Sequence, residues 1–267
     1  MAATGKNIEE PWLRTQIRFM HAVRQENTEQ AAQLLRPHSA DDRKFALNFT
    51  TLLIQSSEKT IRSVIQSEYL NNKSASDEDI EEAAELVMYT EAFRLIYNTV
   101  IESSPLLLAI KQGSVDEVRS LLQQLPRDEA VRLMINTPEV KSIISSKLTN
   151  SEYEHKLTDD IRNNYTLTDE PWPNILSGLS NIIHEAIDTL SNFRGYFSCL
   201  QFAAARGSPE LLTQLLKYIT FSNIREFFTS KQYTITFIGL IIASHSSNQA
   251  VTMTQVLLER TPDEDIK

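Results

Sequence analysis

Glycine is scarce in this chain of 267 residues, which contains only 6 glycines and 9 prolines. Tight β-hairpin turns and glycine-rich phosphate-binding loops both need glycine at positive φ. The shortage therefore argues against an all-β fold and against a nucleotide-binding α/β fold. The single cysteine, Cys199, excludes an internal disulfide and a multi-cysteine zinc site, and it fits a reducing compartment.

Long apolar runs and basic clusters are also missing. The longest apolar stretch lies near 237–243 and is too short to span a bilayer, and the first eleven residues lack the apolar core of a secretory signal. A net charge of −9 opposes binding to nucleic acid or to an anionic membrane surface. We therefore expect a cytoplasmic protein with no membrane insertion and no nucleic-acid partner.

Sequence motifs for metal binding, nucleotide binding and common hydrolases do not occur. No G-x-G-x-x-G, P-loop or G-x-S-x-G motif is found. The five histidines form neither H-E-x-x-H nor another spacing that places two ligands on one helix face; they are His21, His38, His155, His184 and His245. The sequence therefore predicts no metal site, no cofactor and no catalytic residue.

Helical periodicity is present along almost the whole chain. Apolar residues recur every three to four positions over 13–23, 80–93 and 179–190, as an amphipathic helix requires. The run 233–242 is rich in β-branched residues, but it also fits a buried helix and is interpreted as one. Helix breaks are expected at clusters of capping and breaking residues, which fall at 37–41, 71–77, 103–105, 126 and 136–138. The predicted fold class is all-α.

One pattern recurs along the chain. Residues 104–122 read SPLLLAIKQGSVDEVRSLL, with a small Ala109 in a first helix, Gly113 at its end and the pair Leu121–Leu122 in a second helix. A small residue lets a neighbouring helix approach closely, and glycine can end a helix in the left-handed conformation. The same template is found at 18–35, with Phe19, Ala22 and Asn27, and at 199–216, with Ala203 and Gly207; weaker copies lie at 49–65 and 237–258.

This pattern resembles the two-helix part of an ankyrin repeat, T-P-L-H-x-A followed by a glycine turn and a second helix. The usual histidine is replaced in every copy, and the D-x-x-G-x-T hairpin between units is absent after Leu122 and Leu216. Matching small positions lie 30 to 94 residues apart, where the family repeats every 33 or so. The resemblance implies a helical-repeat solenoid of degenerate ankyrin-like helix pairs, with other α-solenoids as the alternative.

The least helical segment, NNYTLTDEPWP at 163–173, is interpreted as a linker. We therefore expect two lobes: an N-terminal helical-repeat lobe at 1–162 and a C-terminal one at 174–267.

The resemblance also implies a non-catalytic module that sequesters or regulates a partner protein through the concave face of the solenoid. Repeat register places on that face the side chains of Arg24, Gln25, Lys111, Gln112, Gln201 and Arg206. Trp172 in the predicted linker is added as an aromatic anchor. The acidic net charge favours a partner with a basic surface patch. Irregular arrays of this style are similar to those of proteins that intracellular bacteria deliver into host cells, where some regulate a second delivered protein.

The alternative interpretation is an enzyme. Its catalytic site would lie in the region 127–194, which contains the polar residues His155, Asp159, Asp160, Tyr165 and His184, or at Cys199 acting as a nucleophile. Alanine at His155, His184 and Cys199 would leave activity intact if the chain is a binding module and would abolish it if the chain is this enzyme.

Overall fold

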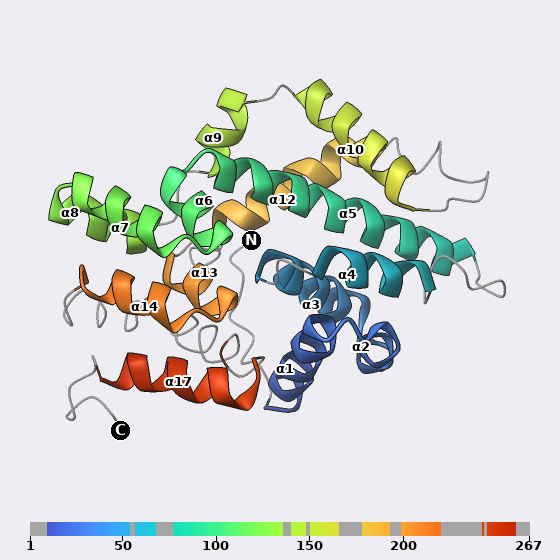
Figure 1. The fold of residues 1–267 in the computed structure, drawn as a ribbon. Coiled ribbons are helices and arrows are strands. Elements are labelled where there is room, and N and C mark those ends of the chain that lie inside the picture. Colours follow the sequence, from blue (N-terminus) through green and yellow to red (C-terminus); the bar gives the residue numbers. More distant parts are fainter. Residues whose placement is uncertain are drawn as a thin grey trace.

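The computed structural model describes residues 10–53, 57–67, 77–135, 140–147, 150–165, 178–192, 199–219, 242 and 245–259. Within these ranges the chain forms fourteen α-helices and no strand (Figure 1). The prediction of an all-α chain is confirmed for this part. The predicted helix at 233–242 lies, apart from its last residue, outside the described residues, as do most of the predicted linker and the first helix of the weak copy at 237–258.

The helices of the first half are α1 (Glu10–Arg24), α2 (Thr28–Leu35), α3 (Ala40–Leu53), α4 (Ser57–Ile65), α5 (Asp77–Glu102), α6 (Pro105–Gln112) and α7 (Val115–Gln124). Those of the second half are α8 (Arg127–Ile135), α9 (Val140–Lys147), α10 (Asn150–Asn164), α12 (Leu179–Asn192), α13 (Cys199–Arg206), α14 (Pro209–Leu216) and α17 (Ser247–Leu258). The three periodic segments at 13–23, 80–93 and 179–190 are therefore helical, as predicted, in α1, α5 and α12.

The long helix α5 is the centre of the fold. It packs against α3, α4 and α6 from the first half of the chain and against α9, α10 and α12 from the second half. Figure 1 shows α5 crossing the molecule with α10 above it and α3 and α4 below it. Apolar residues around its whole circumference are buried between 83 and 101. A helix that is apolar on every face is stable only inside a core, which explains this position.

Two helix pairs that are far apart in the sequence pack side by side. Helix α13 packs on α6 and α14 packs on α7, so first helix meets first helix and second helix meets second helix. The second helices α7 and α14 thus form a row, and α17 continues this row by packing on α14. Figure 1 shows α7, α14 and α17 one below another. The pairs α1–α2 and α3–α4 follow the same rule, because α1 contacts α3 and α2 contacts α4.

The turns inside three of these helix pairs have the same backbone conformation. Among the described residues, positive φ occurs at Glu26, Gly113 and Gly207, with φ of 55°, 78° and 69°. The next residue in each turn is a side-chain N-cap, which accepts a hydrogen bond from the backbone N–H three residues on; these caps are Asn27, Ser114 and Ser208. The left-handed residue ends one helix and the cap starts the next, so the chain reverses within two residues in α6–α7 and α13–α14 and within three in α1–α2.

Small side chains lie in the first helices of these pairs, as the pattern predicts. Ala22, Ala109 and Ala203 are all buried, each 1% exposed or less. The helices that lie between α7 and α13 in the sequence do not come between the pairs α6–α7 and α13–α14 in space. Helix α8 packs on α13, and α9, α10 and α12 pack on α5.

Helices from both sides of the predicted linker 163–173 share one hydrophobic core. Helix α12 packs along α5, and the ring of Phe202 in α13 stacks on that of Tyr97 in α5, with 5.7 Å between centroids. The division into lobes at 1–162 and 174–267 stays a prediction from the sequence.

Candidate functional site

The turns of three helix pairs lie next to one another and form what we call the turn edge: residues 24–27, 112–114 and 205–208. Arg206 donates a hydrogen bond from Nη2 to the backbone oxygen of Gln112 at 3.4 Å, across 94 residues of sequence. Arg24 donates from Nη2 to the backbone oxygen of Ala205 at 3.1 Å, across 181 residues. These bonds bring together three of the residues predicted to bind a partner: Arg24, Gln112 and Arg206.

Both arginines bind carbonyl groups at the C-terminal end of a neighbouring helix. The last carbonyls of a helix have no intrahelical donor and carry a partial negative charge, which a guanidinium satisfies. Burial lowers the pKa of the half-buried Arg24 to about 10, so it remains protonated at neutral pH. The predicted partner-binding residue Arg24 therefore has a role inside the fold, whereas Arg206 is exposed and can also meet another molecule.

His245 binds the same end of α13. Its Nε2 lies 2.9 Å from the backbone oxygen of Ala204, and the residue is 7% exposed. Burial, and then the charge of Arg24, lower the pKa of His245 to about 4. The imidazole is thus neutral at physiological pH, and Nε2 carries the hydrogen because a carbonyl oxygen can only accept. The sequence contains no local signal for this role, since α13 lies far from His245 in the chain.

The other residues predicted to bind a partner differ in their exposure. Gln25 and Gln112 have exposed side chains on the turn edge. Lys111 is half-buried and donates from Nζ to Asn98 Oδ1 at 2.7 Å, and burial lowers its pKa. Gln201 belongs to α13, but its side chain lies outside the described part of the structure, as does the whole of Trp172.

Acidic side chains lie close to the turn edge. The second helix of each of these three pairs carries exposed acidic residues in its first turn, namely Glu29 in α2, Asp116 and Glu117 in α7, and Glu210 in α14. Glu26 is also exposed, in the turn between α1 and α2. Acidic side chains are favourable there because the amino end of a helix is partially positive. The stacking of the pairs gathers these carboxylates from distant parts of the sequence onto one side.

A second polar site surrounds Glu91 of α5, which is 1% exposed. Its carboxylate accepts hydrogen bonds from Arg62 Nε at 2.9 Å and Nη2 at 3.1 Å, from Arg94 Nε at 2.8 Å and from the Tyr165 hydroxyl at 3.0 Å. Arg94 also pairs with Asp160 at 3.2 Å. Burial raises the pKa of Glu91, but the bonds and charges of the two arginines outweigh burial and leave this pKa below its ordinary value.

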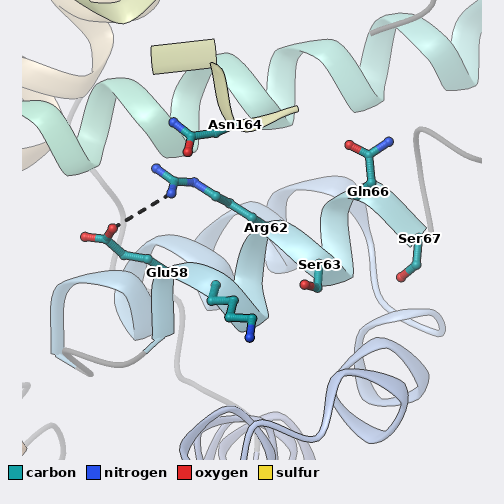
Figure 2. Close-up of a pocket in the computed structure, with 7 residues that line it drawn as sticks. Glu58, Arg62, Ser63, Gln66, Ser67 and Asn164 are labelled. Carbon is teal, nitrogen blue, oxygen red and sulfur yellow. Dashed lines mark ion pairs between the residues drawn. The ribbon is translucent and has the colours of Figure 1, made fainter. Parts of the chain in front are cut away.

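An open pocket of about 570 Å³ adjoins this cluster. Figure 2 shows Arg62 extending from α4 below Asn164 towards Glu58, with which it forms an ion pair at 4.0 Å. The pocket is lined entirely by polar residues, namely Glu58, Lys59, Arg62, Ser63, Gln66, Ser67 and Asn164. Ligand pockets of this size are usually lined mainly by apolar side chains, which this one lacks.

The Glu91 cluster offers little to acid–base catalysis. A general base needs a pKa near the working pH and a free lone pair directed at the substrate. Both oxygens of Glu91 accept hydrogen bonds from the protein, and its pKa is lowered. Burial and the nearby Glu91 charge hold the pKa of Tyr165 well above its ordinary value, so the phenol stays a donor. The cluster joins α4, α5 and α10, and in it Asp160 and Tyr165 are structural partners.

The other residues of the alternative enzymatic interpretation are not brought together. Cys199 is fully buried, burial raises the pKa of its thiol to about 12, and its Sγ lies 3.6 Å from the backbone oxygen of Leu133. A thiol with this pKa is almost entirely protonated at neutral pH and is a poor nucleophile. His155 and His184 are exposed on α10 and α12, where they contact Asp159 and the backbone oxygen of Ser180.

Among the described residues, three or more metal-ligating side chains never come close enough to hold an ion. The same part of the chain contains no helix with the length and apolar character needed to cross a bilayer. Comparisons with protein-family models, with curated proteins and with solved structures found no match for this chain. Any assignment of function therefore depends on the residues of the chain itself.

Proposed function

We propose that this chain is a protein-binding module built as a solenoid of degenerate ankyrin-like helix pairs, and that it binds its partner along the turn edge. In repeat proteins the stacked units present an extended surface to a partner. Sequestration or regulation of a second protein, in the cytosol of a host cell, extends this proposal from the resemblance to bacterial effectors and their regulators.

The recurrence of one turn in three helix pairs is the observation that carries the proposal. Glu26, Gly113 and Gly207 occupy equivalent positions, and each is followed directly by a side-chain N-cap. Left-handed helix ends and side-chain N-caps are each common in helical proteins, and here they occur together at the same position of all three pairs. The packing of first helix on first helix, and of second helix on second helix, is also what a stacked repeat requires.

The exposed carboxylates close to the turn edge, together with the net acidity of the chain, favour a basic partner, although the turn edge itself also contains Arg24 and Arg206. Exposed carboxylates at Glu26, Glu29 and Glu210 lie on this side, and the whole chain carries a net charge of −9. Opposite charge on a partner accelerates encounter and discourages acidic competitors. Exposed Gln25 and Gln112 would add hydrogen bonds that fix the position of the partner.

The test is site-specific photo-crosslinking in cells that contain the natural partner. A photoreactive amino acid is placed at Gln25 or Gln112 on the turn edge, and at the exposed Lys156 of α10 as a matched control. We expect one crosslinked protein of constant mass from both turn-edge positions and none from Lys156. Purified partner should then bind at 1:1 stoichiometry, and Glu26→Lys together with Glu29→Lys should weaken binding about tenfold or more at low salt.

Equal crosslinking at Lys156, or affinity unchanged by the two charge reversals, would refute binding along the turn edge.

Catalysis is tested separately with alanine at His155, His184 and Cys199. Loss of a measured activity in the exposed histidine variants, with their folding unchanged, would favour the enzymatic interpretation.

A further inference from the structure

Few buried side chains hold helix α17 to the rest of the described fold. Of its twelve residues only Met253 is buried, while Val251 and Leu258 are 56% and 45% exposed. Its N-cap, Ser246, makes no capping hydrogen bond, whereas the N-caps of α7 and α14 do. Among the described helices, α17 packs mainly on α14. An element with few buried apolar contacts opens more readily than the core of a fold.

His245 anchors the amino end of this helix. It directly precedes the N-cap, is 7% exposed, and donates from Nε2 to the backbone oxygen of Ala204 in α13 at 2.9 Å. The ring also lies against Gly207, where a Cβ would come within 2.5 Å of Cε1 and 2.8 Å of Nδ1. His245 therefore fixes the start of α17 on the turn between α13 and α14.

The surroundings of this imidazole disfavour a positive charge on it. The carboxyl end of α13 would attract an imidazolium, but Arg24 of α1 already supplies a cation there by donating to the oxygen of Ala205 at 3.1 Å. Arg24 is the one charged side chain among the described residues that acts on the ring. The other groups facing it are uncharged, namely carbonyls of α13 and the amide of Gln249 in α17. A second cation beside Arg24 would be both repelled and poorly hydrated.

We propose that His245 is an acid-sensitive latch, which holds α17 on α14 at neutral pH and releases α17 when the imidazole is protonated, while the rest of the fold persists. Release would uncover the side of α14 on which α17 packs. The latch is a conformational device of the chain itself, and it does not depend on a partner at the turn edge.

The direction of the pH effect follows from proton linkage. Burial, and then the charge of Arg24, lower the pKa of His245 to about 4 when α17 is in place, against 6.5 for a histidine in water. The released form therefore takes up a proton at a higher pH than the closed form does. The closed form has its full stability above pH 6.5 and loses stability progressively as the pH falls towards 4.

Hydrogen exchange of the native chain at pH 7 and pH 5, corrected for the intrinsic exchange rates, measures this opening. We expect the amides of α17 to be at least about tenfold less protected than those of α5, because α17 opens without global unfolding. The opening constant of α17 should rise about fivefold from pH 7 to pH 5. The range ends above the lowered pKa of Glu91, so that ion cluster stays charged. Equal protection of α17 and α5 overturns the proposal.

A neutral substitute identifies the titrating group. In His245→Gln the side-chain amide keeps a donor but cannot take up a proton in this pH range, so the opening of α17 should no longer depend on pH. His184→Gln is the matched control, because His184 is exposed on α12, and it should keep the fivefold rise. The readout is the ratio between two pH values, so a general loss of stability in either variant does not obscure it. A fivefold rise that persists in His245→Gln contradicts the latch.

Thiol labelling provides a second measurement of the same opening. Met253 is fully buried, so the thiol of Met253→Cys reacts only when α17 moves away, whereas the native Cys199 in α13 is buried in the core. With a disulfide reagent that reacts at pH 5, and rates divided by those of the unfolded chain, position 253 should react at least about tenfold faster than Cys199. The acceleration on acidification should be absent from Met253→Cys/His245→Gln. Equal rates at the two thiols would show that α17 opens only by global unfolding and would overturn the proposal.

Discussion

Replacing Gly207 with alanine should be much more damaging than the same change at Gly113, although both glycines end a first helix in the left-handed conformation. A Cβ at Gly207 would lie 2.5 Å from Cε1 and 2.8 Å from Nδ1 of His245. A Cβ at Gly113 would meet the Nε of Arg206 at 2.9 Å, but that side chain is exposed and can move away. The two substitutions share a backbone cost and differ in what the methyl group displaces.

The shared cost is that of placing a residue with a Cβ in the left-handed region, about 1 kcal/mol. At Gly207 the buried imidazole must also move by about 1 Å to restore van der Waals distance. This movement breaks the 2.9 Å bond from His245 Nε2 to the Ala204 oxygen. Leaving buried polar groups unpaired costs about 1–3 kcal/mol. We therefore expect a loss of about 3 kcal/mol for Gly207→Ala and about 1 kcal/mol for Gly113→Ala.

Urea unfolding at pH 7, followed by circular dichroism at 222 nm, measures these differences as shifts of the midpoint at constant slope. The double variant Gly207→Ala/His245→Ala completes a thermodynamic cycle, in which Gly207→Ala should cost only about 1 kcal/mol once the ring is gone. Equal losses at Gly113 and Gly207, or an unchanged cost of Gly207→Ala without His245, would refute the reasoning.

Three further predictions follow from buried groups. Glu91→Gln should lower the free energy of unfolding by about 3 kcal/mol at pH 7, because it removes the countercharge of two arginines. Since the folded pKa of Glu91 lies below 4.5, this loss should shrink as the pH falls through that pKa, which urea unfolding between pH 7 and 3 measures. His245 has a pKa of about 4 in the folded protein against 6.5 in the unfolded chain. As the pH falls from 7 to 5, the unfolded chain therefore gains a proton at His245, and the free energy of unfolding of the wild type should fall by about 1 kcal/mol, allowing for solvent screening. His245→Ala should lack this pH dependence. The Cys199 thiol, with a pKa of about 12, should react with Ellman's reagent at pH 8 only after unfolding, and rapid labelling of the native protein would contradict its burial.

The helix pairs could be predicted because their signals are local. Ser104 and Pro105 start a helix, Ala109 allows close packing and Gly113 ends the helix, all within ten residues. The turn of the pair α1–α2 is harder to predict from sequence, because Glu26 takes the left-handed position where the other two copies have glycine. A glutamate there is uncommon, and the sequence pattern singled out the neighbouring Asn27 instead.

The partners of charged side chains could not be predicted in the same way. Repeat register gave the helix face of Arg24 and Arg206, but their acceptors lie 181 and 94 residues away in the sequence. Glu91 was missed, although a single carboxylate between Thr90 and Ala92 in a long apolar helix is a signal for a buried charge that needs a cationic partner. Which cationic side chain pairs with Glu91 depends on how α4 and α10 pack around α5.

The direct contact between α6 and α13 affects how the protein folds while it is being translated. Gln112 is translated 94 residues before the Arg206 that binds it. At the usual rate of about 5–20 residues per second, the nascent α6–α7 hairpin waits roughly 5–20 s for its neighbour. During that interval Leu106 and Ile110 lack part of their native cover, so the growing chain presents a transient target for chaperones that recognise apolar segments.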